Sequence, residues 1–113
     1  MPGARSNLRM TLPTQLVLRT LLEEPSREMY GLEICAVAGL PSGTIHPILA
    51  RLEQAGWVRS HWENVDPRAE GRPRRRYYRL DPNNIAAVQA ALARADAAVA
   101  RLRLRPGLAG RGQ

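Results

Sequence analysis

The chemistry that this sequence suggests most clearly is the binding of phosphate by arginine. All 17 basic residues are arginines, and there is no lysine. Residues 65–80 hold six of these arginines against Asp66 and Glu70, a net charge of +4, whereas residues 1–64 have no net charge. Arginine presents a planar fork of donors that suits phosphate oxygens. The local excess therefore predicts a polyanionic partner such as nucleic acid. A GC-rich genome would explain arginine over lysine, but not the clustering.

No arrangement of residues predicts catalysis or a metal site. The sequence contains no nucleotide-binding glycine loop, no nucleophile elbow and no His–Glu metal motif. Asp66 and Glu70 lie among arginines, which indicates charge balance rather than an acid–base pair. Cys35, His46 and His61 are the only soft ligands, and they have no ligand spacing. We therefore expect no enzymatic activity, no cofactor and no metal, with Cys35 in the core.

The length and composition are those of one globular domain. The chain has 113 residues, of which 44% are hydrophobic and 24% are charged. It has no apolar run of about 18 residues or more. No small-residue cleavage site follows the apolar stretch 12–22, so neither a membrane span nor a signal peptide is expected. A single cysteine cannot form an intrachain disulfide, which suits a reducing compartment. We expect a cytoplasmic protein with no membrane partner.

Three helices are expected in the first half of the chain. Residues 1–10 contain Pro2, Gly3, Ser6 and Asn7, a composition that predicts a flexible arm. Thr11 is suited to cap a helix over 11–24, whose apolar stripe is wide enough to indicate a second contact beyond its own core. Helices over 28–38 and 42–55 follow, each ended by a glycine. The apolar positions of the third helix fall on one face; they are Ile45, Ile48, Leu49 and Leu52.

Two strands and a last helix are expected in the second half. Residues 57–63 alternate in character and predict a strand. The loop 64–73 separates it from a second strand over 74–80, with Tyr78 and Leu80 on the inner face. Asp81 and the proline after it begin a helix that reaches about residue 104.

This order of elements predicts a mostly α fold with a two-stranded β-hairpin wing, the winged helix-turn-helix arrangement. Residues 11–80 would form the DNA-binding domain, residues 81–105 a C-terminal dimerisation helix, and residues 106–113 a disordered tail. The major groove of a duplex admits one helix, which the third helix would supply. The arginine-rich hairpin would then reach the neighbouring phosphates.

Four strings in this order resemble the PadR family of winged-helix transcriptional regulators. They are MYGLEI (29–34), LPSGTIHP (40–47), RLEQAGWV (51–58) and GRPRRRYYRL (71–80). The resemblance covers about half of the chain and implies a dimeric repressor of the smaller type, with one C-terminal helix. Two positions depart from the family. Leu32 follows Gly31 where the family usually has an aromatic residue, and His46 stands where it usually has tyrosine.

We expect DNA contacts from the third helix and the hairpin. Threonine bonds phosphates or base edges, and arginine favours guanine or phosphate. In the alternative interpretation, Thr44 serves only the helix start, Arg51 pairs with Glu53 or Glu63, and the hairpin arginines are a solvated charge run. Arg76 is expected on the inner face and to be structural. The expected DNA-binding residues are Ser42, Gly43, Thr44, His46, Pro47, Arg51, Arg68, Arg72, Arg74 and Arg75.

The last helix carries a seam whose residues are spaced by three and four. Such a heptad pattern is typical of helix–helix dimerisation. The alternative is that this helix folds back on its own domain. We expect a homodimer in which the first helix of the partner also packs against the seam. The expected dimerisation residues are Ile85, Val88, Leu92, Ala95, Val99 and Leu102.

These features predict a sequence-specific transcriptional regulator, expected to be a dimeric repressor that binds an inverted-repeat operator in double-stranded DNA. Two alternatives stay open: a protein that binds nucleic acid without sequence preference, such as a nucleoid or RNA-binding protein, and a winged-helix module that binds protein. The resemblance also implies a small aromatic or drug-like effector, but the sequence identifies none and is equally consistent with a regulator that has no effector. The candidate stacking groups are Tyr30, Trp57 and Trp62, although both tryptophans have expected places in the core.

Overall fold

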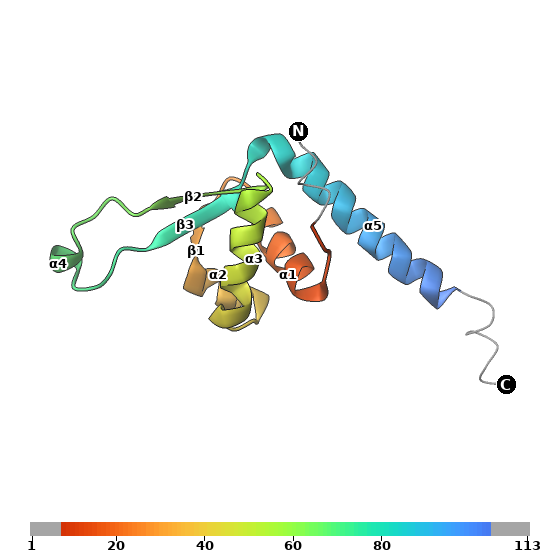
Figure 1. Cartoon of the computed structure of the whole chain (residues 1–113), viewed down its shortest axis with the longest axis horizontal. Helices are drawn as coiled ribbons and strands as arrows, with labels where there is room; N and C mark the ends of the chain where they lie inside the picture. The colour runs from red at the N-terminus through yellow and green to blue at the C-terminus, as the bar shows by residue number, and fades with distance from the viewer. Residues whose placement is uncertain (1–7, 105–113) are drawn as a thin grey trace.

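The structure has the expected winged helix-turn-helix architecture. The computed structural model describes residues 8–104. Within this range, helices pack at one end of a small three-stranded antiparallel sheet, and a long hairpin and a long helix project in opposite directions (Figure 1). The elements are α1 (Leu12–Leu22), β1 (Met29–Tyr30), α2 (Gly31–Ala38), α3 (Ser42–Gln54), β2 (Val58–Trp62), α4 (Pro67–Glu70), β3 (Arg76–Leu80), the 3-10 turn η2 (Pro82–Asn84) and α5 (Ile85–Arg103).

The described part of the chain begins at Leu8, in the segment that leads into α1. Thr11 caps the helix as predicted, because its Oγ1 accepts a hydrogen bond from the backbone N–H of Thr14 at 3.3 Å. Leu8 and Met10 are partly buried and pack against the core. The expectation of a flexible arm over residues 1–10 therefore does not hold for residues 8–10, and residues 1–7 lie outside the described range. Leu12 is 66% exposed, so α1 keeps an apolar side chain outside its own core.

A short strand occupies the expected start of the second helix. Met29 pairs with Tyr78 and Tyr30 with Tyr77, which places β1 at one edge of the sheet in the order β1-β3-β2. The helix prediction over 28–38 was therefore wrong for its first residues. Because Met29 and its partner Tyr78 are almost fifty residues apart in the sequence, no local pattern predicts this pairing. The end of α2 is as predicted, since Gly39 adopts the left-handed conformation with φ of 73°.

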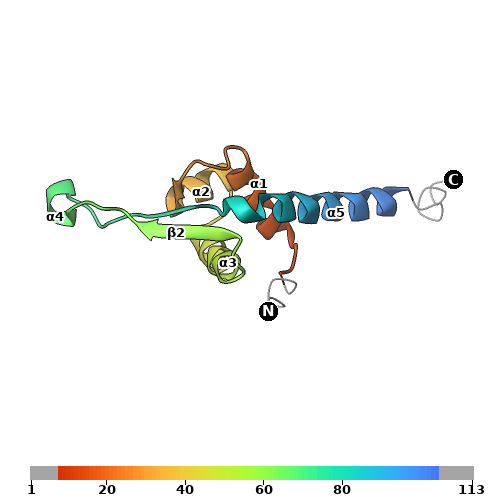
Figure 2. The same ribbon diagram turned by 90° about the horizontal axis from the view of Figure 1, so that it is seen from above.

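Helix α3 buries one face and exposes the other. The four predicted apolar residues are buried; they are Ile45, Ile48, Leu49 and Leu52. Pro47 lies within the helix, on the exposed side. Seen from above, α3 lies on one side of β2 and α2 on the other (Figure 2). The helix therefore stands at the surface while its inner side is held by the core.

The hairpin is buried only at its base. Val58 pairs with Leu80 in the core, and Tyr78 is also buried, as predicted. Trp62 was expected in the core, but it is 58% exposed. The strands run past the end of the helical core at that point, so alternation of side chains no longer implies burial. Beyond the strands, the expected loop contains the one-turn helix α4 (Figure 1).

Asp81 caps the 3-10 turn η2 rather than α5, which begins only at Ile85, so the helix predicted from Asp81 starts as a tighter turn. The Asp81 carboxylate accepts a hydrogen bond from the backbone N–H of Asn83 at 2.9 Å. Only the first part of α5 packs on the domain. Val88, Ala91 and Leu92 are buried. The remainder of α5 projects away from the domain (Figures 1 and 2). The expected disordered tail, 106–113, lies outside the described residues.

Among residues 8–104, no single helix is long and apolar enough to cross a membrane. Helices α2 and α3 together, bent by 112°, would be long and apolar enough by length and composition alone.

Candidate nucleic-acid interface

The exposed side of α3 presents small, neutral and basic groups. Its only acidic residue, Glu53, is turned toward the sheet, where its Oε2 accepts a hydrogen bond from Ser60 Oγ at 2.6 Å. This side could therefore approach a polyanion without a repelling carboxylate. The exposed residues of α3 are Ser42, Gly43, His46, Pro47, Ala50, Arg51 and Gln54.

The first turn of α3 places its predicted contact residues unequally. Ser42 and Gly43 are exposed, whereas Thr44 is half-buried. The backbone N–H of Thr44 donates to the carbonyl oxygen of Pro41 at 3.0 Å. Thr44 therefore takes part in starting the helix, while Ser42 and Gly43 lie at the surface.

His46 lies against the start of α2. An ideal Cβ built on Gly31 would be 3.0 Å from His46 Cε1. Glycine at this position therefore leaves the space that the imidazole ring occupies. The contact fixes the ring next to the exposed side of α3, and the sequence offers no local signal for it.

The loop of the wing is closed, just beyond the paired strands, by an ion pair that the sequence did not predict. Arg72 donates two hydrogen bonds to the Glu63 carboxylate, at 2.8 and 2.9 Å. The backbone N–H of Arg75 donates to Glu63 Oε1 at 3.1 Å. The hydrogen bonds from Arg72, followed by that from the Arg75 N–H, lower the pKa of Glu63 to about 2. Arg72 was expected to contact phosphate, but its fork of donors is already occupied.

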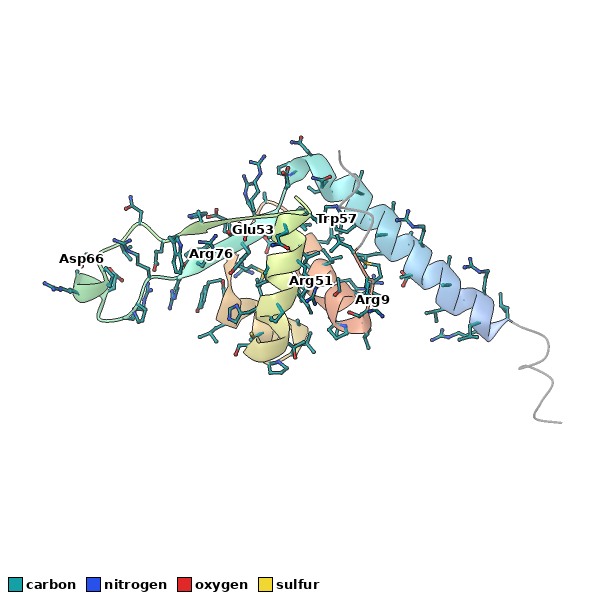
Figure 3. All side chains as sticks on the ribbon, viewed as in Figure 1. Arg9, Arg51, Glu53, Trp57, Asp66 and Arg76 are labelled. Carbon is teal, nitrogen blue, oxygen red and sulfur yellow. The ribbon has the colours of Figure 1, made fainter. Side chains whose placement is uncertain are left out.

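A second set of contacts braces the wing against α3. Arg76 Nη2 lies 3.5 Å from Glu53 Oε2, and its Cζ lies 5.1 Å from the centre of the Trp62 ring. Arg76 thus has the structural role that the sequence predicted for it. These contacts connect the hairpin to α3, and Figure 3 labels Arg76 on the hairpin and Glu53 on α3.

The other wing arginines keep their charge available. Arg68 and Arg74 are exposed, and Arg74 Nε donates to the carbonyl oxygen of Val65 at 3.0 Å. The guanidinium of Arg75 stacks over the Tyr30 ring at 4.2 Å. Among residues 8–104, none of these three arginines forms an ion pair with a carboxylate. Three cationic groups therefore remain for an anionic partner.

A cleft separates the wing from the helices. It encloses about 610 Å³ and brings the Tyr30, Trp62 and His46 rings together with the arginines of the wing. No local pattern in the sequence predicts this cleft, because its walls come from β1, α2, α3 and the hairpin. Aromatic faces beside guanidinium groups suit a ligand that is both planar and negatively charged.

The remaining histidine, His61, connects β2 to Glu28, the residue before β1. His61 Nδ1 lies 3.1 Å from the Trp62 carbonyl oxygen, and Nε2 lies beside a Glu28 carboxylate oxygen. The hydrogen bond to the Trp62 carbonyl, followed by that to Glu28, raises the pKa of His61. Cys35 is partly buried against the core. No group of His, Cys, Asp and Glu that could hold a metal ion occurs among the described residues.

The predicted dimerisation seam is divided by the fold. Val88 and Leu92 are buried against the domain of their own chain, and Ile85 and Ala95 are half-buried. The alternative interpretation, in which the helix folds back, therefore holds for this part. Further along α5, Val99 is 49% and Leu102 is 51% exposed. These last two residues are the ones still open to a partner.

The comparison with family models identifies one family, described as "Transcriptional regulator PadR-like family", which matches residues 17–84. Comparison with curated proteins gives no match.

Among solved structures, the chain is similar to a transcriptional regulator homologue from Pyrococcus horikoshii OT3, with 22% identity and a TM-score of 0.60 over 81% of this chain and 85% of that one. It is also similar to BpsR of Bordetella bronchiseptica, whose DNA binding is regulated by 6-hydroxynicotinic acid. That match has 17% identity and a TM-score of 0.64 over 95% and 74% of the two chains. At these identities the likeness concerns the fold alone.

A third structure is that of reduced AbfR bound to DNA. It matches with 32% identity and a TM-score of 0.57 over 74% of this chain. The match covers 57% of the AbfR chain, so this chain spans less than two thirds of that relative.

Proposed function

The chain belongs to the PadR-like family of transcriptional regulators, and on this basis we propose that it is a dimeric repressor that binds an inverted-repeat operator in double-stranded DNA. Residues 11–80 are the DNA-binding unit in this proposal, and residues 81–105 are the dimerisation helix. Helix α3 enters the major groove and the wing contacts the backbone beside it.

The observation that carries the proposal is the exposed side of α3, which presents no carboxylate and shares a cleft with Arg74 and Arg75, two wing arginines that have no acidic partner among residues 8–104. A helix fits the major groove, which is about 12 Å wide. The contact residues proposed on α3 are Ser42, Gly43, Thr44, His46, Pro47 and Arg51. On the wing they are Arg68, Arg74 and Arg75, whereas Arg72 positions the loop through Glu63.

The proposed dimer uses the part of α5 that its own domain leaves uncovered. Val99 and Leu102 continue the seam along the projecting half of the helix. The exposed Leu12 on α1 offers a second apolar contact for the partner's helix. Two copies related by a twofold axis would hold two α3 helices toward half-sites about one helical turn apart. A palindromic operator follows from this symmetry.

The proposal includes a small-molecule effector, as 6-hydroxynicotinic acid is for BpsR. The cleft of about 610 Å³ between the wing and α3 supports such a partner, since it combines aromatic rings with arginines. A ligand held there would compete with DNA for the same surface. Quenching of Trp62 fluorescence by candidate aromatic acids would detect it, and a Trp62→Ala variant should abolish the signal.

Competition binding tests the proposed function. Genomic footprinting of the protein in its own cell would supply the operator, and a labelled operator duplex would then be displaced by unlabelled operator or by random duplex. A specific regulator binds its operator more tightly by about 4–10 kcal/mol. Thr44→Ala or His46→Ala should reduce this preference, by up to about 1–3 kcal/mol per half-site where the side chain bonds a base edge.

Each alternative function has its own outcome in this assay. Equal displacement by operator and random duplexes would indicate a non-specific nucleic-acid-binding protein. An absence of binding to any duplex at low salt would contradict DNA binding and favour a module that binds protein.

A further inference from the structure

The segment before α1 holds one arginine in a defined place. Leu8 and Met10 pack against the core, and Gln15 Nε2 donates to the Met10 carbonyl oxygen at 2.8 Å. Arg9 lies between these two anchored residues and is exposed. Because its two neighbours are held against the core, the backbone of Arg9 is held at the surface beside them.

Arg9 and Arg51 line the same cavity. It encloses about 400 Å³ between the segment 8–11, α1 and α3, and the buried side chains of Ile48 and Leu52 also border it. Figure 3 shows the two labelled arginines at neighbouring places on the same side of the molecule. Among residues 8–104, neither arginine has a carboxylate partner or a side-chain hydrogen bond. The positive charges of Arg9 and Arg51 repel each other, and an anion bound between them would offset this repulsion.

The cavity lies on the same side as the exposed face of α3, but away from the wing. The segment that carries Arg9 leaves α1 toward the side on which α3 stands (Figure 2). The wing extends from the opposite flank of α3 (Figure 1). A helix in the major groove has one phosphate backbone on each side. The wing and the arginine pair therefore flank α3 as the two DNA strands would.

We propose that Arg9 and Arg51 jointly bind one backbone phosphate of the DNA, on the strand opposite to the one that the wing contacts. The inference rests on the proposed DNA-binding function and adds a second backbone contact to it. Two guanidinium groups around one phosphate form charge-assisted hydrogen bonds from both sides. The contact sets how far α3 enters the groove, because it ties the helix and the segment before α1 to the same phosphate.

The experiment measures the salt dependence of binding to a random-sequence duplex, which needs no knowledge of the operator. The slope of log affinity against log salt falls by about 0.9 for each phosphate that the protein no longer neutralises. Arg9→Gln with Arg51→Gln should flatten the slope by about 0.9 per protomer, or about 1.8 for the dimer. Each single variant retains one guanidinium at the phosphate and should flatten the slope by less than the double variant.

Arg94→Gln is the matched control, since Arg94 is an exposed arginine on α5. It removes one positive charge, as each single variant does, and should leave the slope of log affinity against log salt at the parent value. Thermal unfolding of every variant should match the parent, because Arg9 and Arg51 are both exposed.

Four results would overturn the inference. A double variant with the slope of the parent would show that the pair does not contact the DNA, while the proposed function would stand. A slope flattened by about 1.8 per protomer would indicate two separate phosphates. Saturable binding of inorganic phosphate alone at Arg9 and Arg51, with an unchanged DNA slope, would assign the site to a free anion. A parent protein without salt-dependent DNA binding would overturn the proposed function as well.

Discussion

The close approach of His46 to Gly31 permits a test of what the His46 side chain contributes on the exposed side of α3. A Cβ on Gly31 would approach His46 Cε1 to 3.0 Å, so the ring must move by a few tenths of an ångström. Gly31→Ala should therefore displace the imidazole and weaken operator binding about fivefold, or about 1 kcal/mol, as expected when one hydrogen bond is removed. Fluorescence anisotropy with the operator duplex measures this change.

A double-mutant cycle separates this displacement from other effects of the alanine. In a His46→Ala background no ring remains to be moved, so Gly31→Ala should then leave DNA affinity unchanged. Full additivity of the two effects would show that Gly31 acts in another way. Thermal unfolding of Gly31→Ala should stay close to the parent, because alanine is the better helix former and His46 is exposed.

The carboxylate of Glu63 permits a prediction about pH. Its pKa is lowered to about 2 from an ordinary value of 4.5, so its ion pair with Arg72 stabilises the wing above pH 4.5 and is lost as the pH falls through about 2. We expect the carbon resonance of the Glu63 carboxyl group to titrate near pH 2. A midpoint near 4.5 would contradict the bidentate pairing.

At the scale of the element, the ion pair between Glu63 and Arg72 holds the wing loop that carries the unpaired arginines. Glu63→Gln retains the shape of the side chain but removes the charge that holds Arg72. The wing amides, and the Arg75 N–H above all, should exchange hydrogen faster, while those of α3 should not change. Binding to random and operator duplexes should weaken together, because wing contacts to phosphate carry no sequence information.

Arg59→Gln provides the control for removal of a surface ion pair. Arg59 pairs with Asp81 at the base of the hairpin rather than in the wing loop. It should leave exchange of the wing amides at the parent rate. Equal acceleration in both variants would show that the wing responds to any change of charge, and not to the Glu63 clamp.

At the scale of the whole molecule, α5 both completes the core and offers a surface to a second copy. Val99→Glu should leave the domain folded, because Val99 is 49% exposed, but should produce monomers by placing an unpaired charge in the dimer seam at a cost of several kcal/mol. Sedimentation at micromolar concentration should show a dimer for the parent and a folded monomer for the variant.

Leu92→Glu is the contrasting variant along the same seam. Leu92 is 5% exposed within its own chain, so a charge there should unfold the domain rather than only separate the copies. Circular dichroism distinguishes the two results. A parent that sediments as a folded monomer would contradict the proposed dimer.

Local patterns in the sequence determined the elements and the kind of partner. Thr11, Gly39 and Asp81 end or begin helices through hydrogen bonds or backbone conformations that involve only neighbouring residues. The periodicity of α3 predicted its buried face, since a helix repeats every 3.6 residues. The clustered arginines and the four PadR-like strings pointed to the regulator family to which the chain belongs.

Tertiary structure alone decided which of the candidate residues are free to bind. The seam of α5 is uniform in sequence, but Val88 lies over the domain and Val99 lies beyond it, so only the position of the core separates them. Arg72 is held by Glu63 while Arg74 has no carboxylate partner among residues 8–104, although both belong to one arginine cluster. Burial and charge pairing depend on side chains brought together by folding, and spacing along the chain does not encode where an element ends relative to the core.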